Sequence, residues 1–351
     1  MTLIEVPPLS PVEEKIVVLR HLTAFDLLAV AYPTLRRHEH SANIVLAHAL
    51  ARAPVEFVLT EGQFLAESDV QPPLPPSPQP VPDSNNFWLS VWSQPTKSKP
   101  VLDVVLSCLD SPLGDYPIFL WAAVATQGPG LGRRVGALVE HLAACVDPKR
   151  VFAVFGPTDL ATAFSTTWAR LTGFQTAADP LYNAFHACCT PQTLRVLTPT
   201  KTPHRGVRKA TRFDTEAVAK LCEEFANSSE YPLNKSEATI EAKQLIDKGQ
   251  LWVYETATGE IATICAVSRT SLRVSAITKV YTLPKWRRHG FARDLVQVTT
   301  QRLFECGKYS VVLYVGRDNA ARRVYERIGF QMEDTDAWME FGFVGTNAGH
   351  W

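Results

Sequence analysis

Hydrophobic positions recur with the period of a helix in some segments of the chain and with that of a strand in others. Both halves of the sequence repeat the same order of helix and strand segments. In the first half an apolar run at 116–126 leads into the glycine-rich stretch 127–132, and helix, strand and helix patterns follow. In the second half a strand pattern at 272–284 leads into 287–292, and the same three patterns follow. Each half is therefore predicted to contain strand, tight turn, helix, strand and helix in that order.

Small residues mark equivalent places in the two halves. The equivalent landmarks are Gly130-x-Gly132 and Gly290-x-Ala292, Phe155-Gly156 and Val315-Gly316, and Gly173-Phe174 and Gly329-Phe330. The spacing between the last two landmarks differs by a few residues, which indicates a diverged repeat. We expect two lobes built on one plan, residues 1–200 and residues 201–351, with the boundary in the polar segment 198–209.

The remaining patterns add helices and a hairpin to this plan. Residues 23–53 predict two helices, broken near Pro33 and restarted with Ser41 as the N-cap. The proline-rich insert 71–86 is too polar and too stiff for a core and is predicted to be an extended surface loop. The second half opens with two helical patterns, and a hairpin is expected around Gly259.

Composition and charge exclude several classes of protein. Lys+Arg and Asp+Glu number 35 each, so no overall field attracts nucleic acid or an acidic membrane. The seven cysteines contain no CxxC pair, which is typical of a reduced intracellular protein. The first twenty residues lack the order of a signal peptide, and no apolar run approaches the ~20 residues that span a bilayer. We therefore expect a cytoplasmic protein.

The stretch Arg-Arg-His-Gly-Phe-Ala at 287–292 has the chemistry of a diphosphate site. A strand-to-helix turn presents backbone N–H donors and the positive end of the helix dipole. Gly290 and Ala292 leave space for phosphate oxygens, and Arg287 and Arg288 add positive charge. A glycine near a helix start can also serve a tight turn alone, so this stretch by itself leaves both interpretations open.

The wider pattern narrows the choice. A strand, then [Gln/Arg]-x-x-Gly-x-[Gly/Ala], then Asn-Ala-Ala-Arg-Arg-Val-Tyr-Glu-Arg-Ile-Gly-Phe about 27 residues later, resembles the GCN5-related N-acetyltransferase superfamily over about 210–345. The resemblance implies an α/β (α+β) fold, with a mixed, mostly antiparallel sheet flanked by helices in each lobe. It also implies acetyl-CoA as the acyl donor.

The resemblance assigns roles to individual residues. The turn would hold the coenzyme A pyrophosphate through Arg287, Arg288, His289, Gly290, Phe291 and Ala292. The preceding strand would pair with the pantetheine through the backbone of Val280 and Thr282, and Asn319 would contact the same arm. Tyr325 would be the general acid, since a phenol of pKa ~10 suits a leaving thiolate of similar basicity. The alternative for Tyr325 is a core aromatic beside Val324 and Ile328.

Two features depart from the family pattern. The first lobe looks like a degenerate copy: Gln127–Gly132 fits the phosphate turn, but Trp168 lies near the place of Tyr325 and lacks a suitable proton. We expect the second lobe to bind the cofactor, with the first lobe as the competitor. The strand before 287–292 also contains no glutamate to act as general base. Glu230 is the first candidate and Glu255 the second, although solvated surface glutamates explain both.

The sequence thus predicts an N-acetyltransferase that transfers acetyl from acetyl-CoA to a primary amine of a small molecule in a ternary complex. The alternatives are a non-catalytic acyl-CoA-binding regulatory module and a protein or peptide N-acetyltransferase. No metal is expected, because His38, His40 and His48 lack the spacing of a ligand set. The acceptor, the acyl chain length and the oligomeric state carry no sequence signal.

Overall fold

The computed structural model describes residues 14–54, 86–94, 99–123, 130–195, 206–332 and 337–351. The first half contributes β1 (Lys15–His21), α1 (Ala24–Arg37), α2 (Asn43–Leu50), β2 (Phe87–Gln94), β3 (Val101–Cys108), β6 (Ile118–Ala122), α5 (Leu131–Ala143), β7 (Ala153–Pro157), α6 (Thr158–Thr172) and β8 (Tyr182–Cys189). The second half contributes β9 (Gly206–Lys209), α7 (Thr215–Ala226), α8 (Lys235–Asp247), β10 (Leu251–Glu255), β11 (Ile261–Thr270), β12 (Val274–Thr282), α9 (Phe291–Glu305), β13 (Ser310–Gly316), α10 (Arg322–Ile328) and β14 (Ala337–Gly342). A separate hairpin, β4 (Asp110–Ser111) and β5 (Gly114–Asp115), follows β3.

The two halves repeat one order of helices and strands, as the sequence predicts. Each runs strand, two helices, three strands, helix, strand, helix, strand, apart from the small β4–β5 hairpin. The glycine landmarks also have equivalent places: Gly173 ends α6 and Gly329 ends α10, both with a left-handed backbone (φ 81° and 114°). Only glycine adopts this conformation without steric cost, which explains why both helices end there.

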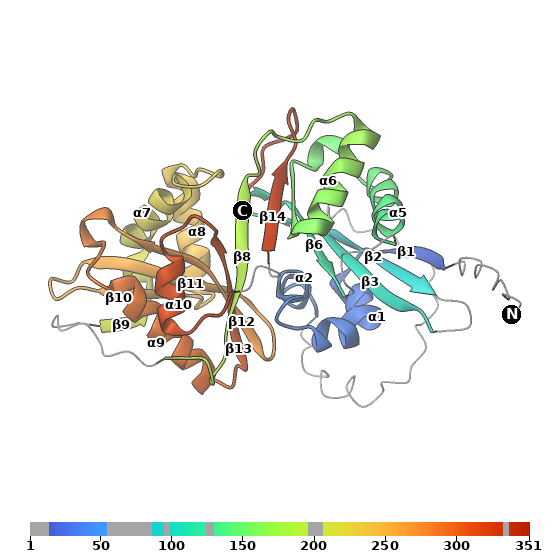
Figure 1. Cartoon of the computed structure of the whole chain (residues 1–351). Coiled ribbons are helices and arrows are strands. Elements are labelled where there is room, and N and C mark those ends of the chain that lie inside the picture. The colour runs from blue at the N-terminus through green and yellow to red at the C-terminus, as the bar shows by residue number, and fades with distance from the viewer. Residues whose placement is uncertain (1–13, 55–85, 95–98, 124–129, 196–205, 333–336) are drawn as a thin grey trace, which may run out of the picture.

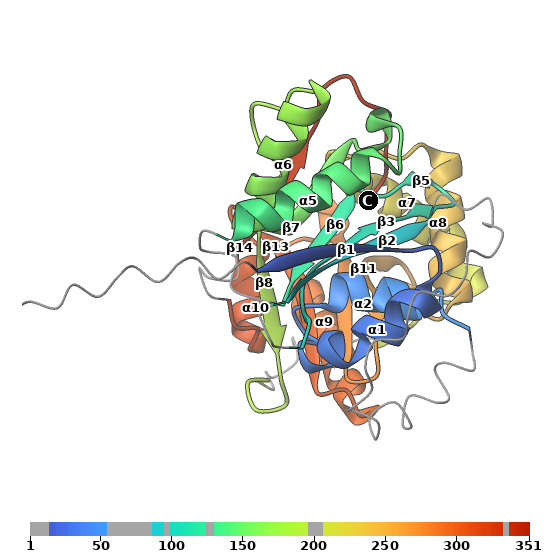
Figure 2. The same cartoon turned by 90° about the vertical axis from the view of Figure 1, so that its right-hand side faces the viewer.

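One mixed sheet of twelve strands runs through both halves (Figure 1), in the order β1-β2-β3-β6-β7-β14-β8-β13-β12-β11-β10-β9 among the described residues. All neighbouring strands are antiparallel except the pairs β6–β7 and β12–β13. The alternation of apolar positions separates two faces. Helices α1, α2, α7 and α8 cover one face, and α5, α6, α9 and α10 cover the other. Figure 2 shows α5 and α6 on the opposite side of the strands from α1 and α2.

The two halves exchange strands at the middle of the sheet. β8 ends the first half but pairs with β13 of the second, at Val312–Cys188 and Tyr314–His186 among others. β14 ends the second half but pairs with β7 of the first, and β8 and β14 pair with each other. The repeat did not predict this exchange. The division into 1–200 and 201–351 stays a prediction, and most of the boundary segment lies outside the described residues, although 206–209 forms β9.

The first two helices differ from their predicted limits. Pro33 lies inside α1, which ends only at Arg37, and Ser41 is not the N-cap of α2. The Ser41 hydroxyl instead donates to the His38 carbonyl at 3.2 Å. The hairpin β10–β11 turns at Gly259 as predicted (φ 86°). The proline-rich insert 71–86 lies outside the described residues apart from Asn86.

Candidate functional site

Strands β12 and β13 separate halfway along, and this opening is the centre of the candidate site. Val274–Ile277 of β12 pairs in parallel with Ser310–Leu313 of β13. An extra residue, Thr278, then shifts the register against β11. Beyond it Lys279–Thr282 pairs with β11 and, within the described residues, with no other strand. A stretch of backbone that contains Val280 and Thr282 therefore lines the opening, as a β-bulge commonly re-aims a strand next to a site.

The predicted phosphate turn lies at the end of β12 and has the required backbone. Gly290 is left-handed (φ 85°) and Arg288 is the single non-glycine residue with positive φ in the part of the chain that the structure describes. Helix α9 begins at Phe291 without a side-chain cap, so the first N–H groups lack an intrahelical acceptor. The residues just before this helix are exposed to solvent: Arg287, Arg288 and His289. These features together fit a diphosphate.

Three residues of this turn make internal contacts. The ring of Phe291 is buried and stacks on Tyr254 at 4.2 Å between centroids, so only its backbone can face a ligand. The Arg287 guanidinium lies 5.5 Å from the ring centroid of Tyr281 and donates to the Thr282 carbonyl at 3.3 Å. The exposed His289 ring lies 2.9 Å from the Arg287 carbonyl through Nδ1 and packs against Trp286, whereas the Arg288 side chain extends from the surface. Two arginines thus bring positive charge to the turn: Arg287, which these contacts hold in place, and Arg288.

Tyr325 lies on α10, on the same side of the sheet as α9. Its side chain is 7% exposed and packs edge-on against Phe330. Burial raises the pKa of the Tyr325 phenol, with smaller contributions from Cys265 and Tyr182. The hydroxyl therefore keeps its proton through the neutral range. Ile328 packs in the same core, so the geometry is compatible with an acid and with a packing residue.

Asn319 is exposed in the loop between β13 and α10. Its side-chain oxygen accepts a hydrogen bond from the Ala321 N–H at 2.9 Å, which stabilises the start of α10. The side-chain amide nitrogen of Asn319 takes no part in this hydrogen bond. A contact with the pantetheine arm remains a prediction for this residue.

The two base candidates from the sequence lie in different places. Glu230 is exposed in the loop between α7 and α8. Glu255 lies at the end of β10, where its carboxylate accepts from Arg208 at 2.7 Å. Arg208 also holds Asp214 at 2.7 Å, so Glu255 belongs to an ion-pair network near the edge strand β9. Glu255 is therefore explained by that network.

A third carboxyl, Glu340, was missed by the sequence analysis. It lies on β14, is 1% exposed, and accepts a hydrogen bond from the hydroxyl of Tyr231, a neighbour of Glu230. Burial raises the pKa of Glu340 to about 8; the nearby Glu230 also raises it, while the Tyr231 hydrogen bond lowers it. The available signal was a glutamate on the buried side of an alternating strand, beside Trp338.

The corresponding turn of the first lobe is built differently. Gly130 has an ordinary helical backbone (φ −79°), and Arg134 lies where a Cβ on it would point. That guanidinium is held by Asp103 at 2.8 Å and Glu14 at 2.6 Å, which places two carboxylates near the start of α5. Residues 127–129 lie outside the described part of the chain. Trp168 is fully buried on α6 and stacks on Phe164.

Solved structures share this arrangement over most of the chain. A GCN5-related N-acetyltransferase from Sphaerobacter thermophilus aligns over 93% of this chain and 94% of its own length, with a TM-score of 0.51 and 14% identity. This chain has the fold of the GCN5-related N-acetyltransferases. A Drosophila protein aligns over 95% of this chain and 99% of its own length, with a TM-score of 0.56 and 11% identity.

A family model matches part of the second lobe by sequence. Residues 251–339 match the family model described as FR47-like protein. This range extends from β10 to the start of β14 and includes the opening between β12 and β13, the turn at Gly290 and Tyr325. No curated protein matches the sequence. Within the described residues, no helix combines the length and apolar character needed to cross a membrane.

Proposed function

We propose that this protein is an N-acetyltransferase that transfers the acetyl group of acetyl-CoA directly to a primary amine of a small molecule. The observation that carries the proposal is the opening between β12 and β13, with the Gly290 turn at the end of β12 and Tyr325 on the helix that follows β13. This is where the fold can hold a thioester between backbone donors and a protonated hydroxyl.

The residues of the second lobe suit the cofactor. The first N–H groups of α9 would hold the pyrophosphate, with charge from Arg287 and Arg288. The backbone of Val280 and Thr282 would hold the pantetheine amides, with Asn319 on the other side of the opening. Bound acetyl-CoA supplies the activated acyl group, and the oxyanion that develops on its carbonyl would be steadied by strand N–H groups.

Tyr325 supports the chemistry as a proton donor. Its raised pKa keeps the hydroxyl protonated, and a protonated hydroxyl can donate to the departing sulfur. Tyr182 lies between the end of β13 and Glu340: its ring faces Gly316, and it is paired with Glu340 by register. The buried Tyr325 interacts with the partly buried Tyr182, and Tyr182 with Glu340, which accepts from Tyr231 of the α7–α8 loop.

The incoming amine must lose a proton, and two carboxyls compete for that role. Glu230 is solvated and next to Tyr231, which makes it accessible to a charged amine. Glu340 is buried, and a base with a pKa of about 8 is better matched to an ammonium group than an ordinary carboxylate is. We propose that Glu340 is the stronger candidate for the general base and that the amine reaches it past Tyr231, its hydrogen-bond partner. Glu230 would attract the charged amine.

The choice of lobe is tested by a matched pair of substitutions at the second residue of each helix. Ala292→Glu places a carboxylate beside the first N–H groups of α9, and Gly132→Glu does the same on α5, where a side chain meets nothing within 4 Å. Acid at a helix N-terminus is compatible with folding. Acetyl-CoA at a hundredfold excess over its Kd should stabilise the wild type by about 2.7 kcal/mol.

The thermal midpoint is the measurement. Ala292→Glu should lose the shift caused by acetyl-CoA, because its charge and volume take the place of a phosphate oxygen, and Gly132→Glu should keep it. Gly290→Glu should also lose it, but that variant adds strain at a left-handed backbone and is secondary. The reverse result, with the shift lost only in Gly132→Glu, would assign the cofactor to the first lobe.

A further inference from the structure

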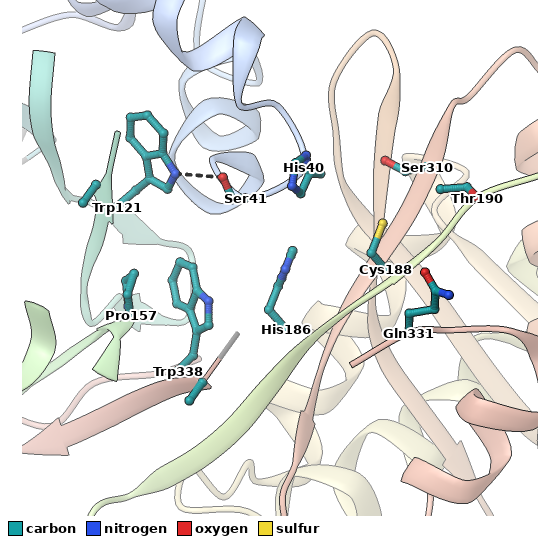
Figure 3. Close-up of a pocket in the computed structure, with 12 residues that line it drawn as sticks. His40, Ser41, Trp121, Pro157, His186, Cys188, Thr190, Ser310, Gln331 and Trp338 are labelled. Carbon is teal, nitrogen blue, oxygen red and sulfur yellow. Dashed lines mark hydrogen bonds between the residues drawn. The ribbon is translucent and has the colours of Figure 1, made fainter. Parts of the chain in front are cut away.

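A cavity of about 450 Å³ lies at the junction of the two lobes, apart from the opening between β12 and β13. It is located where β6 and β7 separate: they pair only at Ile118–Val154 and Phe119–Phe155, and the cavity is lined by the residues that follow, Trp121 and Pro157. Its other walls come from the α1–α2 loop, β8 and the start of β14 (Figure 3). The strand exchange therefore completes this cavity.

His186 is the most deeply buried of the polar side chains that line the cavity. The side chain comes from β8, is 5% exposed, and points into the cavity between Trp338 and Cys188 in Figure 3. Burial lowers the pKa of His186 to about 3, with a smaller lowering by His40 and Arg269, so the imidazole is neutral. The ring donates a hydrogen bond to the His40 backbone carbonyl, while the buried Nε2 has no partner among the described residues. This favours the tautomer with the proton on Nδ1 and a lone pair on Nε2.

The remaining lining sets the character of a ligand. None of the described residues that line the cavity is Asp, Glu, Lys or Arg. Trp121 and Trp338 form an aromatic wall, and the Trp121 indole N–H is already used by Ser41 Oγ at 3.2 Å. A buried acceptor left without a donor costs about 1–3 kcal/mol, which a ligand N–H or O–H directed at Nε2 would recover.

We propose that this cavity is a second binding site, for a neutral small molecule with a flat apolar body and one N–H or O–H donor directed at His186 Nε2. The site lies towards Ser310, at the start of β13, whereas the opening beside Tyr325 lies at the other end of that strand. Its volume falls within the range of small-molecule sites. The proposal does not depend on acyl transfer.

Indole and 1-methylindole test it, because they share an apolar body and only indole has an N–H donor. Cys188 lines the cavity and reports occupancy: bound indole should slow its alkylation by iodoacetamide, measured by peptide mass spectrometry. Cys306 is exposed outside the cavity and is the internal control. Indole should protect Cys188 but not Cys306, and 1-methylindole should need about tenfold higher concentration.

Two variants assign the donor preference to His186. His186→Leu should remove the difference between the two probes, and His186→Gln, which keeps an acceptor, should retain part of it. If His186→Leu does not fold, the probe pair on the wild-type chain still decides. Equal protection by both probes, or none by either, overturns the proposal. Protection of Cys188 by acetyl-CoA in place of indole also overturns it, because the cavity would then be a cofactor site.

Discussion

A substitution of Tyr325 best distinguishes an enzyme from a non-catalytic binding module. Tyr325→Phe keeps the ring that packs against Phe330 and removes the proton donor. If the hydroxyl protonates the leaving thiolate, kcat should fall by about 10²–10⁴-fold while the affinity for coenzyme A changes little. Turnover is measured as thiol release with a library of small amines, and affinity as the shift of the thermal midpoint.

The contrary outcome for Tyr325 is equally definite. A variant that loses thermal stability but keeps its turnover per folded molecule would return Tyr325 to the core, beside Ile328. A wild-type chain that binds acetyl-CoA but acetylates no amine would favour the regulatory module. The raised pKa also implies that Tyr325 itself produces no loss of activity between pH 6 and 9, since it stays protonated there.

The raised pKa of Glu340 predicts that the stability of the molecule depends on pH. Its pKa is about 8 in the folded chain and near the ordinary 4.5 when unfolded, so between these values the folded chain holds a proton that the unfolded chain has released. Its contribution to stability is therefore complete below pH 4.5 and is lost as the pH rises towards 8, by at most about 1.4 kcal/mol per pH unit. Glu340→Gln resembles the protonated acid and should flatten this dependence.

The measurement for Glu340 is urea unfolding at pH 5, 6.5 and 8. The free energy of unfolding should fall more between pH 5 and 8 in the wild type than in Glu340→Gln. Glu230→Gln is the control, because the exposed Glu230 raises the pKa of Glu340 only as a secondary cause, so the slope should change little. Parallel slopes in wild type and Glu340→Gln would show that Glu340 is ionised in the folded chain.

At the scale of elements, the sequence predicts what depends on local residues. The turn at Gly290, the ends of α6 and α10 at Gly173 and Gly329, and the β10–β11 hairpin all depend on a glycine with positive φ, and all are found. Helix α1 is the exception: Pro33 lies within it, because packing of its buried side chains outweighs the local disruption.

What depends on distant strands could not be predicted. The separation of β12 from β13 follows from pairing between segments some 35 residues apart, and the burial of Glu340 follows from β7 and β8 on either side of β14. Periodicity places Glu340 on one face of a strand but cannot say that this face is covered. The unpartnered nitrogen of His186 has the same origin, since its surroundings come from both halves.

At the scale of the whole molecule, the strand exchange determines how the two lobes fold. β8 ends the first lobe but pairs with β13 of the second, and β14 ends the second lobe but pairs with β7 of the first. Neither lobe therefore completes its part of the sheet alone. Further contacts join them: Glu39, in the loop after α1, accepts from the Ser271 hydroxyl at 2.6 Å and the Arg273 N–H at 2.8 Å. A repeat in sequence therefore need not mean two independent folding units.

This arrangement predicts one cooperative unfolding transition, and Met339→Pro tests it. Met339 lies in the middle of β14, between β7 and β8, and proline removes an N–H from a central strand. A carbonyl left without its donor costs about 1–3 kcal/mol, in addition to the disturbance by the ring. Hydrogen exchange should accelerate in both β7 and β13, which belong to different lobes, and the single thermal transition should shift as a whole.

Ile16→Pro on the edge strand β1 is the control and should affect β2 while β13 keeps its protection. Two separate transitions in the wild-type chain, or unchanged exchange in β13 of Met339→Pro, would mean that the lobes unfold independently despite sharing a sheet.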